Sequence, residues 1–267
     1  MSVRLPYIHW LKEFLKQNPN PDNVGMNRIL RRLAIWRTEL LVNTFAQHHG
    51  LTVLRGPFRG LQYVGRATEG ALMPRLLGSY ESELHPFIEE FAAGQLDCVI
   101  DIGCAEGYYA VGLACLMPKV QVHAFDIDDK ARAACTALAA KNGVSDRVVV
   151  GGAFGPEDFA AFSGKRCLVW IDAEGYEDEV LDPVASPGLA AMSVIVETHE
   201  MFKPGVMQRL QDRFAATHNI KVVRQHAKTT ALPDWLAELN HLDQLLAVWE
   251  WRAGPTPWLV MTPKDWK

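Results

Sequence analysis

From residue 97 onward the chain alternates short apolar runs with segments of helical periodicity, and this alternation constrains the fold more than any other feature. Strands that alternate with helices form a parallel sheet that is covered by helices on both faces. The sequence therefore predicts an α/β fold. The predicted strands are 97–102, 120–125, 147–150, 167–171, 192–197 and 220–225, and the predicted helices are 81–92, 108–117, 129–142, 176–182 and 205–217.

The first 75 residues do not follow this alternation. Apolar residues recur at helical spacing in LPYIHWLKEFLKQ and in MNRILRRLAIWRTELLVNTFAQHHG, with NPNPDN as the break between two helices. LTVLRGPFRGLQYV then predicts two short strands around a Gly-Pro turn. We therefore predict a helical N-terminal extension with a short hairpin at 1–75, followed by the main domain at 76–267.

Charge and cysteine content narrow the class of protein. The net charge is −4, but residues 1–60 carry nine Lys and Arg against three acids, so a basic N-terminus precedes an acidic body. Such a segment suits a nucleic acid or a membrane surface, and it suits a solvated helix face equally well. The five cysteines have no disulfide or metal spacing. With no signal-peptide pattern and no apolar run of about 18 residues, we expect a cytoplasmic protein without a membrane span.

A loop rich in small residues lies in VIDIGCAEGYYAVGLA, residues 99–114. Gly103, Ala105 and Gly107 allow the backbone to turn tightly and to approach a ligand, and the helix that follows offers free N–H groups. In an open parallel sheet, ligands bind beyond the carboxyl ends of the strands, so this loop is expected to face a ligand. Packing alone also requires glycine in such turns, so the loop does not decide the question.

The acid after the next strand, in HAFDIDD, favours a nucleotide-like ligand at this loop. Asp126 lies 23 positions after Gly103, where nucleotide-binding sheets place an acid that accepts hydrogen bonds from ribose hydroxyls. Asp128 or Asp129 is better placed to cap the following helix. A dinucleotide fingerprint needs two residues before its last glycine, whereas GCAEG has one, and Asp101 puts a negative charge where a pyrophosphate would lie. A ligand with a cationic amine and no phosphate suits this loop better.

From about Tyr80 to Glu200 the sequence resembles the class I S-adenosylmethionine (SAM)-dependent methyltransferases, and within them the FkbM-like branch. VIDIGCAEGYYAVGLA is similar to the first motif of the class, VHAFDID to its ribose-binding acid, LVWIDAEGYEDEVL to the Asp-x-Glu-Gly signature of the branch, and VIVETHE to the next strand. The resemblance implies a Rossmann-like, mostly parallel seven-stranded sheet whose last strand, with PWLVMTP as the candidate, is antiparallel. Residues 227–256 then form an insertion before that strand.

The resemblance also implies a SAM site in three parts. The loop from Gly103 to Gly107 would hold the methionyl end, Asp126 the ribose, and Ile127 with Ala153 and Phe154 the adenine. Tyr80 and Glu81 either line the same pocket or simply pack. The expected cofactor-binding residues are Tyr80, Glu81, Asp101, Gly103, Cys104, Ala105, Gly107, Asp126, Ile127, Ala153, Phe154 and Asp172.

Catalytic candidates follow two adjacent predicted strands. Methyl transfer from a sulfonium is an in-line displacement, so an enzyme contributes chiefly by positioning the nucleophile and removing its proton. One route uses His199 as a general base, with Asp172 or Glu174 orienting it. The other route uses a divalent cation such as Mg²⁺, held by Asp172 and Glu197 much as in metal-dependent O-methyltransferases. Glu200 follows the same strand as His199, and the sequence leaves both routes open.

We expect a SAM-dependent methyltransferase that acts on a hydroxyl of a small molecule, such as a sugar or a natural product. In the insertion, Trp249, Trp251 and Arg252 are candidates for substrate recognition. A nicotinamide-dependent oxidoreductase shares the sheet and the ribose acid, but the GCAEG spacing disfavours it. A cofactor-binding protein without catalytic activity is a further alternative.

A nucleic-acid (RNA) methyltransferase is the main alternative for the substrate. It would use the basic N-terminal region, and its binding would depend on Arg28, Arg31, Arg32 and Arg37. The absence of an NPPY-like element at the fourth strand argues against base N-methylation. We therefore expect a small-molecule substrate, no nucleic-acid or membrane partner, and a homodimer formed through the N-terminal helices.

Overall fold

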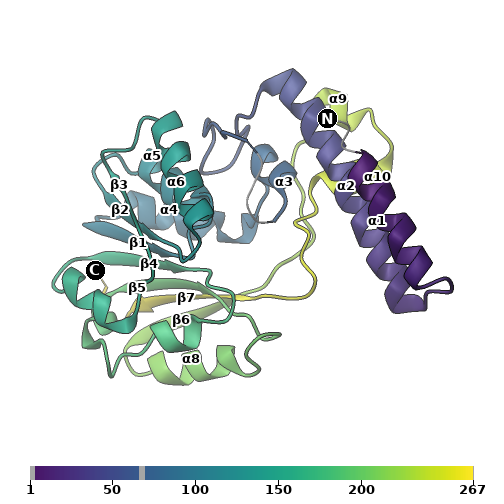
Figure 1. Cartoon of the computed structure of the whole chain (residues 1–267). Helices are drawn as coiled ribbons and strands as arrows, with labels where there is room; N and C mark the ends of the chain where they lie inside the picture. Colours follow the sequence, from purple (N-terminus) through teal and green to yellow (C-terminus); the bar gives the residue numbers. More distant parts are fainter. Residues whose placement is uncertain (1–3, 66–69, 267) are drawn as a thin grey trace.

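The computed structural model describes residues 4–65 and 70–266 (Figure 1). Both predicted N-terminal helices are present, as α1 (Arg4–Gln17) and α2 (Asn23–His49), and they form a helical hairpin to one side of the sheet. Asp22 caps α2 by accepting a hydrogen bond from the N–H of Gly25 at 2.8 Å. Within the described part of the chain, no helix is both long enough and apolar enough to cross a membrane.

The predicted hairpin in LTVLRGPFRGLQYV is wrong in its extent. The structure retains only an isolated antiparallel bridge between Thr52 and Gln62. Pro57 has no backbone N–H to donate to a ladder, and Gly56 has a positive φ of 74°, so the chain between the two bridge residues forms turns. The turn signal was correct, but the flanking residues do not pair as strands.

One seven-stranded sheet forms the centre of the molecule, with the strand order β3-β2-β1-β4-β5-β7-β6. The first five strands pair in parallel, whereas β7 pairs antiparallel with both β5 and β6. This topology is the Rossmann-like class I methyltransferase fold, so the expected fold is confirmed. The strands are β1 (Cys98–Ile102), β2 (Gln121–Phe125), β3 (Val148–Gly151), β4 (Cys167–Ile171), β5 (Ser193–Glu197), β6 (His218–Val223) and β7 (Trp258–Pro263).

Helices cover both faces of this sheet, as the alternation predicts (Figure 1). Three predicted helices are shorter than expected, and the one predicted at 205–217 covers only Val206–Phe214. The helix predicted at 81–92 begins at His85, because Glu81 is left-handed with φ 47° and a 3-10 turn follows it; the helix predicted at 176–182 has only four residues. The helices are α3 (Leu72–Leu77), α4 (His85–Ala93), α5 (Tyr108–Leu116), α6 (Asp129–Lys141), α7 (Glu177–Val180), α8 (Val206–Phe214), α9 (Asp234–Ala237) and α10 (His241–Ala247), with 3-10 turns at Ser82–Leu84, Pro156–Phe162 and Pro187–Ala191.

Alternate residues of the central strands belong to two separate cores. On β4, Leu168 and Trp170 face the core beneath α4, α5 and α6, whereas Cys167, Val169 and Ile171 face the core beneath α8. Successive side chains of a strand point to opposite faces, so a strand that is apolar throughout must be covered on both sides. The central strands are therefore fixed in place, and their carboxyl ends form a rigid platform.

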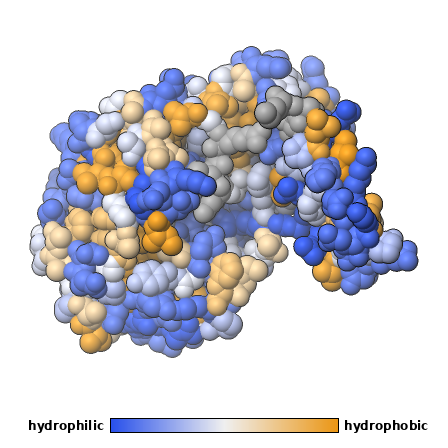
Figure 2. All heavy atoms as spheres, viewed as in Figure 1, coloured by the Kyte–Doolittle hydropathy of each residue, from blue (hydrophilic) through white to orange (hydrophobic). Residues whose placement is uncertain are grey.

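The insertion before β7 lies against the N-terminal extension, although the two are far apart in sequence (Figure 1). Arg37 of α2 forms an ion pair with Asp243 of α10, with Nε and Oδ1 2.6 Å apart. Arg31 donates hydrogen bonds to the carbonyl oxygens of Trp251 at 2.7 Å and Arg252 at 3.0 Å. Figure 2 shows a notch between the sheet and the far end of the helical hairpin. The extension and the insertion thus form one helical layer beside the sheet.

Candidate active site

A cavity of about 420 Å³ lies where the loop after β1 meets the carboxyl ends of β4 and β5. Residues of the insertion, from Glu250 to Thr256, complete its wall. Nine of the residues predicted for cofactor binding, metal binding or catalysis line this cavity: Tyr80, Asp101, Gly103, Cys104, Ala105, Asp172, Glu174, Glu197 and His199. Of the residues predicted for substrate recognition, Trp251 and Arg252 line it and Trp249 does not. The other predicted residues, Glu81, Gly107, Asp126, Ile127, Ala153 and Phe154, lie outside its lining.

Gly103 lets the loop after β1 pass directly against the loop after β4. Its φ is 83°, and a Cβ added to it would lie 1.8 Å from the carbonyl oxygen of Asp172. The N–H of Asp172 in turn donates to the carbonyl of Ile102 at 3.0 Å. This contact requires glycine, because any side chain would push the two backbones apart.

Asp126 holds the same loop from the other side. Its carboxylate accepts the N–H of Ala105 at 2.9 Å and the N–H of Asp128 at 2.8 Å. Asp128 caps α6 by accepting from the N–H of Lys130 at 2.9 Å, as predicted. Asp126 is therefore fixed in orientation at the end of β2 and is not needed as the helix cap.

The three residues expected around the adenine do not share one environment. Ile127 is 85% exposed, an unusual position for a large apolar side chain, and Ala153 is exposed as well. Phe154 is buried, and its ring lies 4.7 Å from that of Phe125. The structure thus exposes Ile127 directly after Asp126, whereas Phe154 packs inside the protein.

Asp101 is a buried carboxylate in the cavity wall. Its Oδ2 has no hydrogen-bond partner among the described residues. Burial raises the pKa of Asp101 to about 7, the backbone N–H of Ala110 partly offsets this, and the charge of Asp126 adds to it. A buried acid oxygen without a partner fits a cationic group placed in the cavity.

Tyr80 belongs to the wall beside this acid. Its ring lies under the guanidinium of Arg75, which is 4.5 Å from the ring centroid. Arg75 also forms a buried ion pair with Glu106 of the loop after β1. Tyr80 therefore both lines the cavity and packs, and the two interpretations of this residue are compatible.

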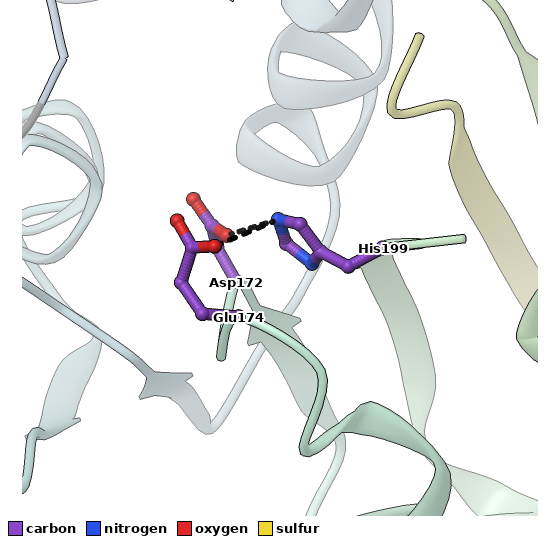
Figure 3. Close-up of side chains that lie close together, drawn as sticks. All are labelled: Asp172, Glu174 and His199. Carbon is purple, nitrogen blue, oxygen red and sulfur yellow. Dashed lines mark ion pairs between the residues drawn. The ribbon is translucent and has the colours of Figure 1, made fainter. Parts of the chain in front are cut away.

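Two acids and a histidine converge where β4 and β5 end (Figure 3). The Nε2 atom of His199 lies 3.6 Å from Oδ1 of Asp172 and 3.7 Å from Oε2 of Glu174. Glu174 and Gly175 both have positive φ, 48° and 103°, so the chain turns sharply after β4. The predicted convergence of these three residues is found, and His199 is buried rather than on the surface.

Glu177 is a functional candidate that the sequence analysis did not identify. Its Oε1 lies 2.6 Å from Nδ1 of His199 and also accepts the N–H of Gly175 at 3.0 Å. Burial lowers the pKa of His199, but Glu177 and the nearby acids outweigh it, so the net pKa is raised. The available signal was its spacing, three residues after Glu174 in EGYE.

Glu197 and Glu200 have other partners at the end of β5. One oxygen of Glu197 pairs with Arg252 and accepts from Thr256 Oγ1 at 2.5 Å. Its other oxygen, Oε2, lies 3.5 Å from Nε2 of His199, so Glu197, the predicted second metal ligand, borders the group formed by Asp172, Glu174 and His199. Glu200 turns away from the cavity and accepts backbone N–H groups at the start of α8.

Arg252 of the insertion is surrounded by acids. It forms ion pairs with Glu81, Glu197 and Glu250, and the Nε–Oε2 distance to Glu250 is 3.0 Å. Burial raises the pKa of Glu81 to about 7, although the charge of Arg252 lowers it. Burial and the charges of Glu197 and Glu81 raise the pKa of Asp172 well above its usual value. The cavity therefore has an excess of acidic groups over cations.

Comparisons with known proteins leave the substrate open. No protein-family model matches the chain, and no curated protein matches it. An O-methyltransferase of Bacillus cereus in complex with SAH is 10% identical, with a TM-score of 0.48 over 97% of this chain and 100% of that one.

Two other solved structures cover less of the chain. An O-methyltransferase of Streptomyces achromogenes involved in tomaymycin synthesis, in complex with SAM, is 12% identical, with a TM-score of 0.49 over 70% of this chain and 81% of that one. A candidate rRNA methylase of Clostridium thermocellum is 16% identical, with a TM-score of 0.45 over 69% and 97%. At these identities the similarity concerns the fold alone.

Proposed function

We propose that the chain is a SAM-dependent methyltransferase that acts on a hydroxyl of a small molecule. The observation that carries the proposal is the meeting of two sites in one cavity. The glycine loop after β1 and Asp101, whose Oδ2 has no partner among the described residues, line one part of the cavity, and the cluster of Asp172, Glu174 and His199 lines the part beside it. A methyl donor and an acceptor placed in this cavity are next to each other.

The residues present fit SAM. Gly103 lets the loop after β1 pack directly against Asp172, Asp101 offers an unpartnered buried oxygen for an ammonium group, and Asp126 presents a fixed acid for ribose hydroxyls. When bound, SAM supplies a methyl group on a cationic sulfur. The residues of the chain bind and orient the two reactants and accept the proton of the acceptor hydroxyl at the cluster around His199.

The contacts of the N-terminal arginines favour a small molecule over a nucleic acid. Arg31 and Arg37 bind residues of the insertion, the guanidinium of Arg28 lies over Phe14, and that of Arg32 lies over two rings of α1. These side chains hold the helical layer together, which reduces their availability to phosphates. An FkbM-like enzyme of small-molecule metabolism is the finer assignment that we propose.

The first test is calorimetric titration with S-adenosylhomocysteine, beside NADH. We expect micromolar binding of S-adenosylhomocysteine alone, and at least about 30-fold weaker binding by Asp126→Ala, because a lost pair of hydrogen bonds to ribose costs about 2 kcal/mol. Asp128→Ala is the matched control, since it removes only the cap of α6. Binding of NADH instead, or no binding of either compound, would contradict the proposal.

The affinity for S-adenosylhomocysteine should also depend on pH through Asp101. Because the pKa of this acid is about 7, it is partly protonated in the free protein at neutral pH. A ligand ammonium binds the ionised form, so affinity should rise with pH between 5.5 and 7.5, by up to about tenfold per pH unit.

The variant Asp101→Asn isolates this effect. Glu81 also has a pKa of about 7, and its contribution is present in both proteins, so the difference between the two titration series belongs to Asp101. We expect Asp101→Asn to bind S-adenosylhomocysteine more weakly than the unchanged protein at pH 7.5. Its affinity should also change less between pH 5.5 and 7.5. Parallel curves for the two proteins would show that Asp101 does not face the ligand amine.

A further inference from the structure

We propose that Asp172, Glu174 and His199 bind one divalent first-row cation, such as Mn²⁺, on the acceptor side of the cavity. The role of this cation in catalysis rests on the proposed function, whereas the binding site itself rests only on the positions of the three side chains. The three side chains come from the turn after β4 and the end of β5, and they point toward one another (Figure 3).

The spacing of the three side chains suits a single ion. One ligand atom from each residue lies within 4.8 Å of the other two, and the distances from His199 Nε2 to the two carboxylate oxygens are 3.6 and 3.7 Å. Metal–ligand bonds of about 2.0–2.2 Å place neighbouring ligand atoms about 3 to 4 Å apart. An ion between them therefore needs only small side-chain movements.

A second observation points to a ligand at this position. The side chain of His199 is only 5% exposed, and its Nε2 faces carboxylate oxygens of Asp172, Glu174 and Glu197 at 3.5 to 3.7 Å, longer than an ordinary hydrogen bond. The carboxylate of Glu177, which is completely buried, accepts a hydrogen bond from Nδ1–H at 2.6 Å. This fixes the tautomer whose Nε2 lone pair faces Asp172 and Glu174. A carboxylate behind a metal-binding imidazole is a common arrangement.

The chemistry of the donors selects the class of cation. One imidazole nitrogen and two carboxylates suit first-row cations such as Mn²⁺ or Zn²⁺ better than Ca²⁺, which prefers oxygen ligands alone. The side chain of Asp172 is 30% exposed and that of Glu174 is 60% exposed, so the ion would face the open cavity. Coordination positions on that side remain for an acceptor hydroxyl, whose pKa the cation lowers.

The test is calorimetric titration of the full, metal-stripped chain with MnCl₂, together with electron paramagnetic resonance of bound Mn²⁺. We expect one site per chain, and a dissociation constant raised at least about 30-fold in His199→Ala and about tenfold in Glu177→Gln. Glu174→Gln, whose side chain is exposed, gives a variant that keeps its fold and still binds about tenfold more weakly. His226→Ala, which replaces an exposed histidine, should bind normally.

Titration of the same samples with S-adenosylhomocysteine separates the two proposals. Saturable Mn²⁺ binding that is lost in the His199 and Glu174 variants supports the cation site, whether or not the cofactor binds. Cofactor binding without Mn²⁺ binding overturns the cation site and leaves His199 as the general base. Mn²⁺ binding that is unchanged in both variants also overturns it, because the ion would then lie elsewhere.

Discussion

Gly103→Ala is expected to destabilise the protein by about 2–5 kcal/mol. The added Cβ would lie 1.8 Å from the carbonyl oxygen of Asp172, a backbone atom that cannot rotate away. Overpacking of this kind costs about 1–3 kcal/mol, and a left-handed conformation costs a residue other than glycine about 1–2 kcal/mol more. Urea unfolding of the purified variant measures the loss.

Two other glycines separate these contributions. Gly143 has φ 68° with no atom within 4 Å of an added Cβ, so Gly143→Ala should show the conformational cost alone, about 1 kcal/mol. Gly152 has neither a positive φ nor a close neighbour, and Gly152→Ala should be neutral or slightly stabilising. If Gly103→Ala were as mild as Gly143→Ala, the contact between the loops after β1 and β4 would be looser than described.

Arg252→Met should destabilise the protein by about 3 kcal/mol at pH 8 and by less at pH 5. The substitution leaves Glu81, Glu197 and Glu250 without their shared cation, and breaking a buried ion pair from one side costs about 3–5 kcal/mol. At pH 5 the cost is smaller, because Glu81 is protonated and no longer carries an uncompensated charge. Unfolding curves at several pH values measure the difference.

The sign of this pH dependence follows from Glu81. Its pKa is about 7 with Arg252 present and rises further without it, whereas in the unfolded chain it returns to its ordinary value. Between these two values the folded variant binds more protons than the unfolded chain, so its stability falls as pH rises.

Two further variants serve as controls for Arg252→Met. Adding Glu81→Gln should recover part of the stability lost at pH 8, because it removes one of the uncompensated charges. Arg209→Met breaks an exposed pair with Asp178 and should cost at most about 1 kcal/mol without a comparable pH dependence. An equal loss at pH 5 and pH 8 in Arg252→Met would contradict the account of this network.

The sequence predicts the central sheet well, because its strands are apolar on both faces. Each of β1, β4 and β5 has five residues, and all of them are buried. A short, fully apolar run between helical segments is typical of a strand that is covered on both faces. β6 has a mixed burial pattern and lies at the sheet edge, and its predicted bounds, 220–225, are two residues late. Prediction is weakest where one face of a strand meets solvent.

The site could be predicted only as far as strand ends determine it. Parallel strands bring their carboxyl ends together, so Asp172 and His199 could be placed near each other from the pattern alone. The partners Glu177 and Arg252 could not, because their contacts depend on how a short helix and a 30-residue insertion fold over the sheet. Arg252 meets Glu81 across 171 residues of sequence, and no local pattern carries that information.

The hydrogen bonds from Arg31 to the carbonyls of Trp251 and Arg252 have a consequence for synthesis on the ribosome. The residues they join are up to 221 positions apart. At a synthesis rate of about 5–20 residues per second, the insertion is made about 10–45 s after the helical hairpin. During that time its apolar side chains lack the cover of α10. The wall that the insertion contributes is thus added long after the cofactor loop, and a nascent chain stalled before the insertion holds that loop but not the wall that Arg252 completes.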